Sequence, residues 1–133
     1  MLTTHDGELH LQQILSRMCD ESLRLALPGV AVVGFFHANH GLRSLARVRG
    51  AMIGDNANFL AIAYSKLAEM CDTGHPSGSG SRVAYIGELA YVGGSLVVTE
   101  HGTYLAAFSG ATSEEDLAIA LHGLHVVMPP QRG

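Results

Sequence analysis

Charged side chains are scarce in this sequence. Asp, Glu, Lys and Arg make up only 15% of the 133 residues, and eight Lys and Arg against twelve Asp and Glu give a net charge of −4. Domains that bind nucleic acids usually carry a clearly basic patch, so we expect no nucleic-acid partner. So few charges also leave little surface that is purely solvated, and we therefore expect a homo-oligomer.

Cysteines and long apolar runs are scarce as well. Cys19 and Cys71 lack the spacing of a C-x-x-C motif or a zinc site, and two thiols without a disulfide framework are typical of a cytoplasmic protein. The N-terminal sequence M-L-T-T-H-D-G-E lacks the basic and apolar regions of a signal peptide. Because no apolar run approaches about 18 residues, we also expect no membrane-spanning segment.

Apolar residues, in contrast, make up 47% of the sequence, which suits the packed core of one domain over 1–133 with loose ends at 1–7 and 128–133. The predicted elements are a helix at 8–27, strands at 30–36 and 42–49, a helix capped by Asp55 or Asn56 and ending near Cys71, a flexible Gly/Ser loop at 75–82, a strand or helical turn at 83–91, strands at 95–99 and 103–109, and a final helix. Hairpins that alternate with single helices predict an α+β fold, an antiparallel sheet with helices packed on it.

The start of the final helix carries the strongest local signal. Gly110 ends the preceding strand, and Thr112 or Ser113 can cap the helix with Glu115 or Asp116 three residues later, which is a capping box. Acidic residues in the first turn are also favoured by the positive end of the helix dipole.

The same region resembles a known family. The stretch F-S-G-A-T-S-E-E-D-L-A-I-A at 108–120 is similar to the V-S-G-[GA]-T-x-E-x-D-x-x-I-A signature of the GlcG/HbpS-like family, which includes the C-terminal domain of PduO-type proteins. Three weaker similarities keep the family's order: A-R-V-R-G-A at 46–51, A-I-A-Y-S-K-L-A at 61–68, and the pair Gly93-Gly94. The resemblance implies a profilin-like fold, assembly into a dimer or larger oligomer, and binding of haem or a related tetrapyrrole.

The sequence departs from the family pattern at three positions. Tyr104 and Ala107 stand where the family has glycines in the last strand, and Arg49 replaces an acidic residue. Because glycine in a strand often lets a ligand or another backbone approach closely, larger side chains there are expected to reshape a pocket.

Three arginines are candidate ligand-binding residues. Arg43, Arg47 and Arg49 alternate along one predicted strand, so their side chains share a face. They could clamp a carboxylate such as a haem propionate, or else form a solvated face or salt bridges at a subunit contact. Arg47 is favoured because it lies in the turn that resembles the family.

Histidines and one lysine complete the candidate set. The sequence has eight histidines, and neutral imidazole is a good ligand for iron or zinc. His75, in the Gly/Ser loop, and His37, beside a turn, are the leading metal ligands, although a single histidine is more often structural or solvated. Lys66 matches the lysine of the family's helix; it could bind an anion with a lowered pKa, or pack its stem and extend its ammonium to water.

The leading hypothesis is a cytoplasmic, homo-oligomeric binding protein for haem or a similarly flat, carboxylate-bearing molecule. The ligand would lie between the second helix, the loop after it and the last hairpin, with His75 or His37 on the metal and Arg47 or Arg49 on the carboxylates. One alternative is an enzyme acting on a small organic acid, with Arg47 as the carboxylate anchor and His37 or His75 as the general base. Another is an accessory subunit of a catabolic or cofactor-dependent enzyme.

Overall fold

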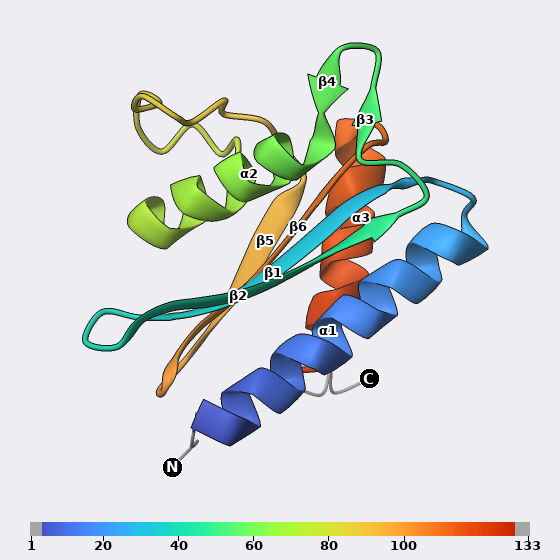
Figure 1. Ribbon diagram of the computed structural model, residues 1–133. Helices are drawn as coiled ribbons and strands as arrows, with labels where there is room; N and C mark the ends of the chain where they lie inside the picture. Colours follow the sequence, from blue (N-terminus) through green and yellow to red (C-terminus); the bar gives the residue numbers. More distant parts are fainter. Residues whose placement is uncertain (1–3, 130–133) are drawn as a thin grey trace.

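The structure, a computed structural model, describes residues 4–129, with side chains from Gly7 onward. In chain order the elements are α1 (Thr4–Arg24), β1 (Gly29–His37), β2 (Gly41–Arg49), β3 (Ile53–Gly54), β4 (Ala57–Asn58), α2 (Phe59–Thr73), β5 (Gly94–Thr99), β6 (Gly102–Ser109) and α3 (Ser113–Leu124). Helices α1 and α3 cover one face of a four-stranded antiparallel sheet, and α2 lies on the other (Figure 1). This arrangement confirms the predicted α+β fold class.

The sheet has the strand order β2-β1-β6-β5. β1 is therefore an inner strand, and its first six residues are all buried, which explains the almost wholly apolar sequence there. β2 is an edge strand and exposes most of its residues. β3 and β4 form a separate two-stranded ladder that periodicity does not predict, because each strand has only two residues.

Two helix starts differ from the prediction. α1 begins at Thr4, so residues 4–7 are helical rather than loose, and Gly7 is buried against Phe35; residues 1–3 and 130–133 of the predicted loose ends lie outside the described residues. Asp55 and Asn56 do not cap α2. They turn the chain between β3 and β4 with φ of 48° and 62°, a conformation that Asp and Asn tolerate.

The caps themselves follow the expected chemistry. The side chain of Asn58 caps α2 by accepting a hydrogen bond from the backbone N–H of Ala61. Thr112 caps α3 and forms the predicted capping box with Glu115, in which each side chain accepts a hydrogen bond from the other residue's backbone N–H.

Alternate residues of the sheet supply two separate cores. Ala31 and Val33 of β1 point to the α1/α3 side, and Val30 and Val32 point to the α2 side. The α1/α3 core is the larger and includes buried residues from both helices: Leu11, Ile14, Leu15, Met18, Cys19, Ile119, Ala120 and Leu124. The α2 core is smaller, because one helix cannot cover a whole four-stranded sheet. Among the described residues, no helix combines the length and apolar character that a bilayer span requires.

Residues 74–93 connect α2 to β5 and lie along α2 as an irregular loop. The stretch 83–91, for which the sequence permits a short strand or a helical turn, is neither. In Figure 1 this loop is drawn in gold above α2, away from the edge strand β2.

Candidate functional site

The three candidate arginines do share one face of β2, as predicted. The strand register pairs Phe35 with Arg43 and Ala31 with Arg47, so these side chains lie on the α1 side of the sheet. Nη1 of Arg43 donates a hydrogen bond to the Glu8 carboxylate of α1 at 2.7 Å. Arg43 is therefore occupied by a carboxylate of the same chain.

Arg47 and Arg49 have no such carboxylate. Neither forms an ion pair with an Asp or Glu whose side chain the structure describes. Arg47 lies against the thiol of Cys19, whose pKa is raised by burial although both arginines act in the opposite direction. The Nε of Arg49 is buried without a hydrogen-bond partner in the described part of the chain. A buried polar atom without a hydrogen-bond partner is uncommon in a folded protein.

His37 lies at the other end of this hairpin. It pairs with Gly41 at the turn, whereas Arg49 pairs with Gly29 at the opposite end of β1, about 26 Å away at roughly 3.3 Å per residue. The centre of the His37 ring is 4.8 Å from that of the His40 ring. The Nδ1 of His37 accepts a hydrogen bond from the backbone N–H of Asn39 in the turn. His37 is therefore nearer to Arg43 than to Arg49.

His75 lies in a different place again, directly after Gly74 at the end of α2. It lines an open polar hollow of about 250 Å³ together with Asp72, Thr73, Ser81 and Arg82. This hollow is on the α2 side of the sheet, whereas the arginines of β2 point to the α1 side. Among the side chains that the structure describes, from Gly7 to residue 129, no group of three or more His, Cys, Asp or Glu is placed to hold a metal ion.

Lys66 is buried in an ion pair inside the chain. Its Nζ donates to the carbonyl of Phe108 at 2.6 Å and to Oδ2 of Asp116 at 3.0 Å, while Oδ1 of Asp116 accepts from the backbone N–H of Ala111. The two side chains are only 3% and 6% exposed. Burial lowers the pKa of Lys66 and raises that of Asp116, and the attraction between the two charges opposes both shifts. A side chain at position 93 would collide with this ammonium, because a Cβ on Gly93 would lie 2.3 Å from the Nζ of Lys66.

This ion pair explains the stretch that resembles the family signature. Asp116 joins α3 to Lys66 of α2 across the end of β6, and Thr112 and Glu115 cap the same helix. The anion that Lys66 binds is thus Asp116 of its own chain, and its ammonium is not free for a ligand. The signature residues at 108–120 hold the fold together at this point.

Tyr104, which stands where the family that the sequence resembles has a glycine, does not close the edge of the sheet. It lies on the inner strand β6, points to the α1/α3 side, and is 1% exposed. Its hydroxyl hydrogen-bonds to Nδ1 of His10 at 2.9 Å, and its ring packs on Phe35. Ala107 points to the α2 side and is buried beside Gly94. Both larger side chains are part of the core.

The α2 side of the edge strand is open and apolar. Its exposed residues are Leu42, Ala46 and Val48, which the register pairs with α2-facing residues of β1, and beside them lie Leu60 and Tyr64 of α2. We call these five residues the apolar band. Leu42 and Val48 are 44% and 48% exposed, and the hydroxyls of Tyr64 and Ser44 are 3.3 Å apart, which connects α2 to β2.

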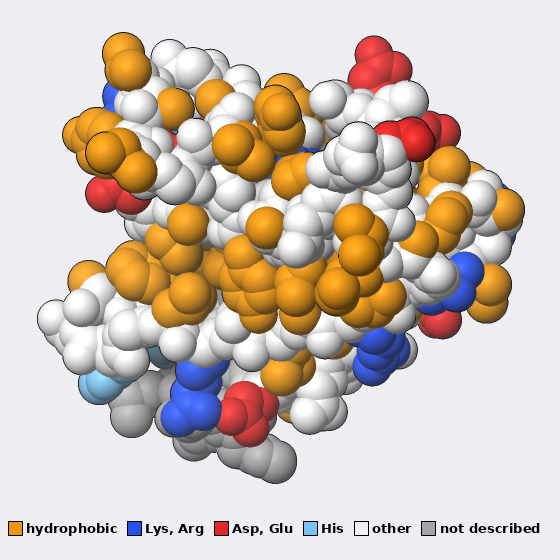
Figure 2. Space-filling view, turned by 45° about the horizontal axis from the view of Figure 1, so that its top comes forward, with side chains coloured by type: hydrophobic (Ala, Val, Ile, Leu, Met, Phe, Trp, Pro, Cys, Tyr) orange, Lys and Arg blue, Asp and Glu red, His pale blue; other side chains and the backbone are white. Residues whose placement is uncertain are grey.

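Figure 2 shows hydrophobic side chains gathered across the middle of this face, with Lys and Arg side chains along the lower border. The reason is that β2 is an edge strand. Residues 42, 46 and 48 point to one side and Arg43, Arg47 and Arg49 to the other, so both sets reach the same rim of the sheet. This edge of the sheet therefore combines an exposed apolar surface with two arginines that form no ion pair with any carboxylate the structure describes.

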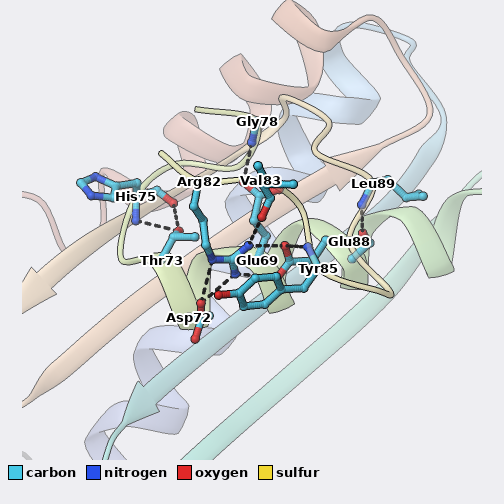
Figure 3. Close-up of polar contacts among 11 residues, drawn as sticks. Glu69, Asp72, Thr73, His75, Gly78, Arg82, Val83, Tyr85, Glu88 and Leu89 are labelled. Carbon is cyan, nitrogen blue, oxygen red and sulfur yellow. Dashed lines mark hydrogen bonds and ion pairs between the residues drawn. The ribbon is translucent and has the colours of Figure 1, made fainter. Parts of the chain in front are cut away.

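A second polar network anchors the loop over α2 (Figure 3). Arg82 forms ion pairs with Asp72 and Glu88, each at 2.7 Å, and its guanidinium stacks on the ring of Tyr85. Arg82 and a hydrogen bond from the backbone of Tyr85 lower the pKa of Glu88 to about 2. Further bonds run from the N–H groups of Gly78, Leu89 and Gly94 to side chains of Glu69, Ser65 and Ser77. Sequence reasoning missed this network, because partners in an irregular loop have no characteristic spacing.

Comparison with known proteins shows the same fold in several solved structures. No protein-family model matches the sequence, and neither does any curated protein. The crystal structure of a PduOC:heme complex matches with a TM-score of 0.71 at 13% identity, covering 95% of this chain and 94% of that one. The Klebsiella pneumoniae protein ORFY, described as DUF336, gives 0.67 at 14% identity over 89% and 87% of the chains. HbpS gives 0.59 at 19% identity over 97% and 94%. These similarities confirm the profilin-like fold that the sequence resemblance implies.

Proposed function

We propose that this protein binds haem or a similarly flat, carboxylate-bearing molecule on the apolar band of β2 and α2. The observation that carries the proposal is the rim itself, where exposed Leu42 and Val48 lie next to Arg47 and Arg49, which have no carboxylate partner among the described side chains. Apolar surface of this kind gains about 25 cal/mol for each Å² that a ligand removes from water.

The arginines would supply orientation. A guanidinium binds a carboxylate through two parallel hydrogen bonds, and this geometry is specific as well as strong. A flat ligand lying on the band would place its carboxylates over the edge of the sheet, where Arg47 and Arg49 emerge. The Nε of Arg49 has no hydrogen-bond partner among the described residues, so turning this side chain towards a ligand breaks no hydrogen bond of that atom.

A metal-containing ligand would need an imidazole or a similar donor. His37 and His75 remain the two candidates, and they differ in position. His37 belongs to the β1–β2 hairpin that carries the rim, whereas His75 lies beyond the C-terminus of α2 in the polar hollow. Neither histidine lies beside Arg47 and Arg49, so the variants His37→Ala and His75→Ala decide whether either of them is the ligand.

Two broader features support the proposal. The fold is that of several solved proteins, one of which is described as a haem complex. Cys19 and Cys71 are free thiols, which supports a reducing compartment such as the cytoplasm. We also propose that the protein is a homo-oligomer, since its exposed apolar surface is large for a chain with few charges.

Titration of the protein with hemin, followed by absorbance, tests this function. We expect a shifted Soret band and saturable binding. Replacing both Arg47 and Arg49 with Ala should weaken binding by about tenfold, the equivalent of one charge-assisted hydrogen bond. Arg24→Ala is the charge-matched control, because Arg24 pairs with Glu21 on the exposed surface of α1 and is not part of β2.

The histidine variants test the metal ligand. His37→Ala should change the shape of the Soret band, and His75→Ala is the second variant to compare. If hemin produces no Soret shift, or if the shift is the same in both histidine variants as in the wild type, the assignment of haem with these ligands is wrong.

The two alternatives find less support. An enzyme acting on a small organic acid needs Arg47 within reach of His37 or His75. His37 lies at the turn end of the hairpin, away from Arg47, and His75 lies on the α2 side of the sheet while Arg47 lies on the α1 side. An accessory subunit would use the same apolar surface for a partner protein. Co-purification with one stoichiometric partner, in place of hemin binding, would favour that function.

A further inference from the structure

A second apolar surface lies on the loop between α2 and β5. Six large apolar side chains in residues 83–92 are exposed to solvent: Val83, Tyr85, Ile86, Leu89, Tyr91 and Val92. We call these six residues the apolar loop. Ile86 is 108% exposed and Val83 84%, so the most apolar side chains project furthest. So many exposed apolar side chains within ten residues of a small protein favour a contact site.

The apolar loop is held in place at several points. Arg82 connects it to Asp72 of α2 and to Glu88 within the loop, and the N–H of Leu89 donates to the hydroxyl of Ser65 in α2 (Figure 3). The N–H of Tyr85 also donates to Glu88. Because these bonds order the backbone in advance, a partner that binds the apolar side chains loses less conformational entropy on association.

The charged side chains at the apolar loop form ion pairs within the same chain. Its cation Arg82 and its anion Glu88 are paired with each other, and the remaining charge on Arg82 is met by Asp72. A surface of this kind can meet an identical copy of itself without bringing like charges together. It offers no unpaired Lys or Arg for an anionic membrane surface, which favours a protein partner.

The exposed area is suitable for a contact between two copies. At about 150–200 Å² for a fully exposed large side chain, the six residues present roughly 600–750 Å² of apolar surface. A standard stable interface covers about 800 Å² on each partner, including its polar rim. Symmetrical pairing of two apolar loops would therefore reach the size of a specific dimer.

We propose that the apolar loop is the contact of a two-fold symmetric homodimer, in which residues 83–92 of one copy pack on the same residues of the other. This contact is separate from the apolar band. Ser65 and Asp72 hold the loop on one side of α2, whereas Leu60 and Tyr64 face β2 on another. The dimer therefore forms without a ligand and leaves the band accessible.

Sedimentation velocity of the ligand-free protein over a wide range of concentration tests the proposal. We expect the wild type to be a dimer and Ile86→Glu to raise the dimer dissociation constant by at least about a hundredfold, because two copies would bury unpaired carboxylates against each other. Ile86 makes no demand on the fold, since it is fully exposed. Leu23→Glu is the matched control, because Leu23 is 63% exposed on α1, on the opposite side of the sheet, and this variant should remain dimeric.

Two further variants keep the dimer contact distinct from the ligand site. Val83→Glu should dissociate the dimer as Ile86→Glu does, while Ala46→Glu on the apolar band should leave it intact. A wild-type protein that is monomeric at every concentration overturns the proposal. So does a dimer that Ala46→Glu dissociates and Ile86→Glu does not, because the contact would then be the edge strand.

Discussion

The two faces of the sheet are built from the same alternation of apolar residues but are covered to different extents. On one face, α1 and α3 bury a core that includes Phe108 and Leu124 completely. On the other, α2 alone covers the inner strands, and the edge strand β2 keeps Leu42 and Val48 nearly half exposed. We expect the covered face to contribute more to stability than the open face, which is where we propose that the ligand binds.

The largest effect on stability is expected at Asp116. This residue of α3 forms the buried ion pair with Lys66 of α2 and so connects the helices on the two faces of the sheet. Asp116→Asn keeps a side-chain oxygen for the N–H of Ala111 but leaves the buried ammonium of Lys66 without its counter-ion. We expect a loss of about 3–5 kcal/mol in the free energy of unfolding, measured by urea denaturation.

The double variant Lys66→Met/Asp116→Asn is the control for this prediction. Because it removes both charges while Asn keeps a side-chain oxygen for the N–H of Ala111, it should recover most of the lost stability. A double variant as unstable as the single one would mean that the unpaired charge is not the cause.

A matched pair of leucines compares the two faces directly. Leu124→Ala, in the α1/α3 core, should lower the free energy of unfolding by about 2–5 kcal/mol, because it leaves a cavity in a fully buried site. Leu42→Ala, on the open band, should lower it by less than about 1 kcal/mol, since the side chain is already 44% in water. Similar losses in thermal or urea unfolding would show that the two faces contribute equally.

The smallest effect on the free energy of unfolding is expected from Glu88, in the loop between α2 and β5. The pKa of Glu88 is lowered to about 2 in the folded protein, from an ordinary value near 4.5. A carboxyl with a lowered pKa stabilises the folded form above its unfolded pKa, and this contribution is lost as the pH falls from 4.5 through 2. The protection factor of the Leu89 amide, which is its hydrogen exchange relative to the intrinsic rate at each pH, should therefore fall in this pH range while the core amides stay protected.

Arg82→Ala should produce the same local effect at neutral pH, because it removes the partner that lowers the pKa of Glu88. Unchanged protection of Leu89 in this variant would show that the Arg82 network does not hold the loop.

Local sequence patterns predict much of the fold. The apolar run of β1, the turn at Gly102 and the capping box of Thr112 and Glu115 depend on residues that are close in sequence, and the structure contains each of them. The two-residue strands β3 and β4 are too short to show a period, so Asp55 and Asn56 resemble a helix cap until the turn between these strands is seen.

The candidate site was less predictable because it depends on which helix covers which face. Alternation places Arg43 and Arg47 on one side of β2, but only the packing of α1 shows that this side belongs to Glu8 and Cys19. In the same way, Lys66 and Asp116 are 50 residues apart, and no local pattern joins them. Side-chain chemistry was therefore visible in the sequence, and its spatial grouping was not.

The most direct test of the central claim is hemin titration of two charge insertions on opposite sides of the sheet. Ala46→Glu places a carboxylate in the middle of the apolar band, and Leu23→Glu places one on the outer side of α1. If hemin binds on the apolar band, Ala46→Glu should weaken hemin binding by at least about tenfold, because the apolar ligand would have to cover a charge. Leu23→Glu should bind hemin as the wild type does. Equal hemin affinity in the two variants would contradict binding on the band.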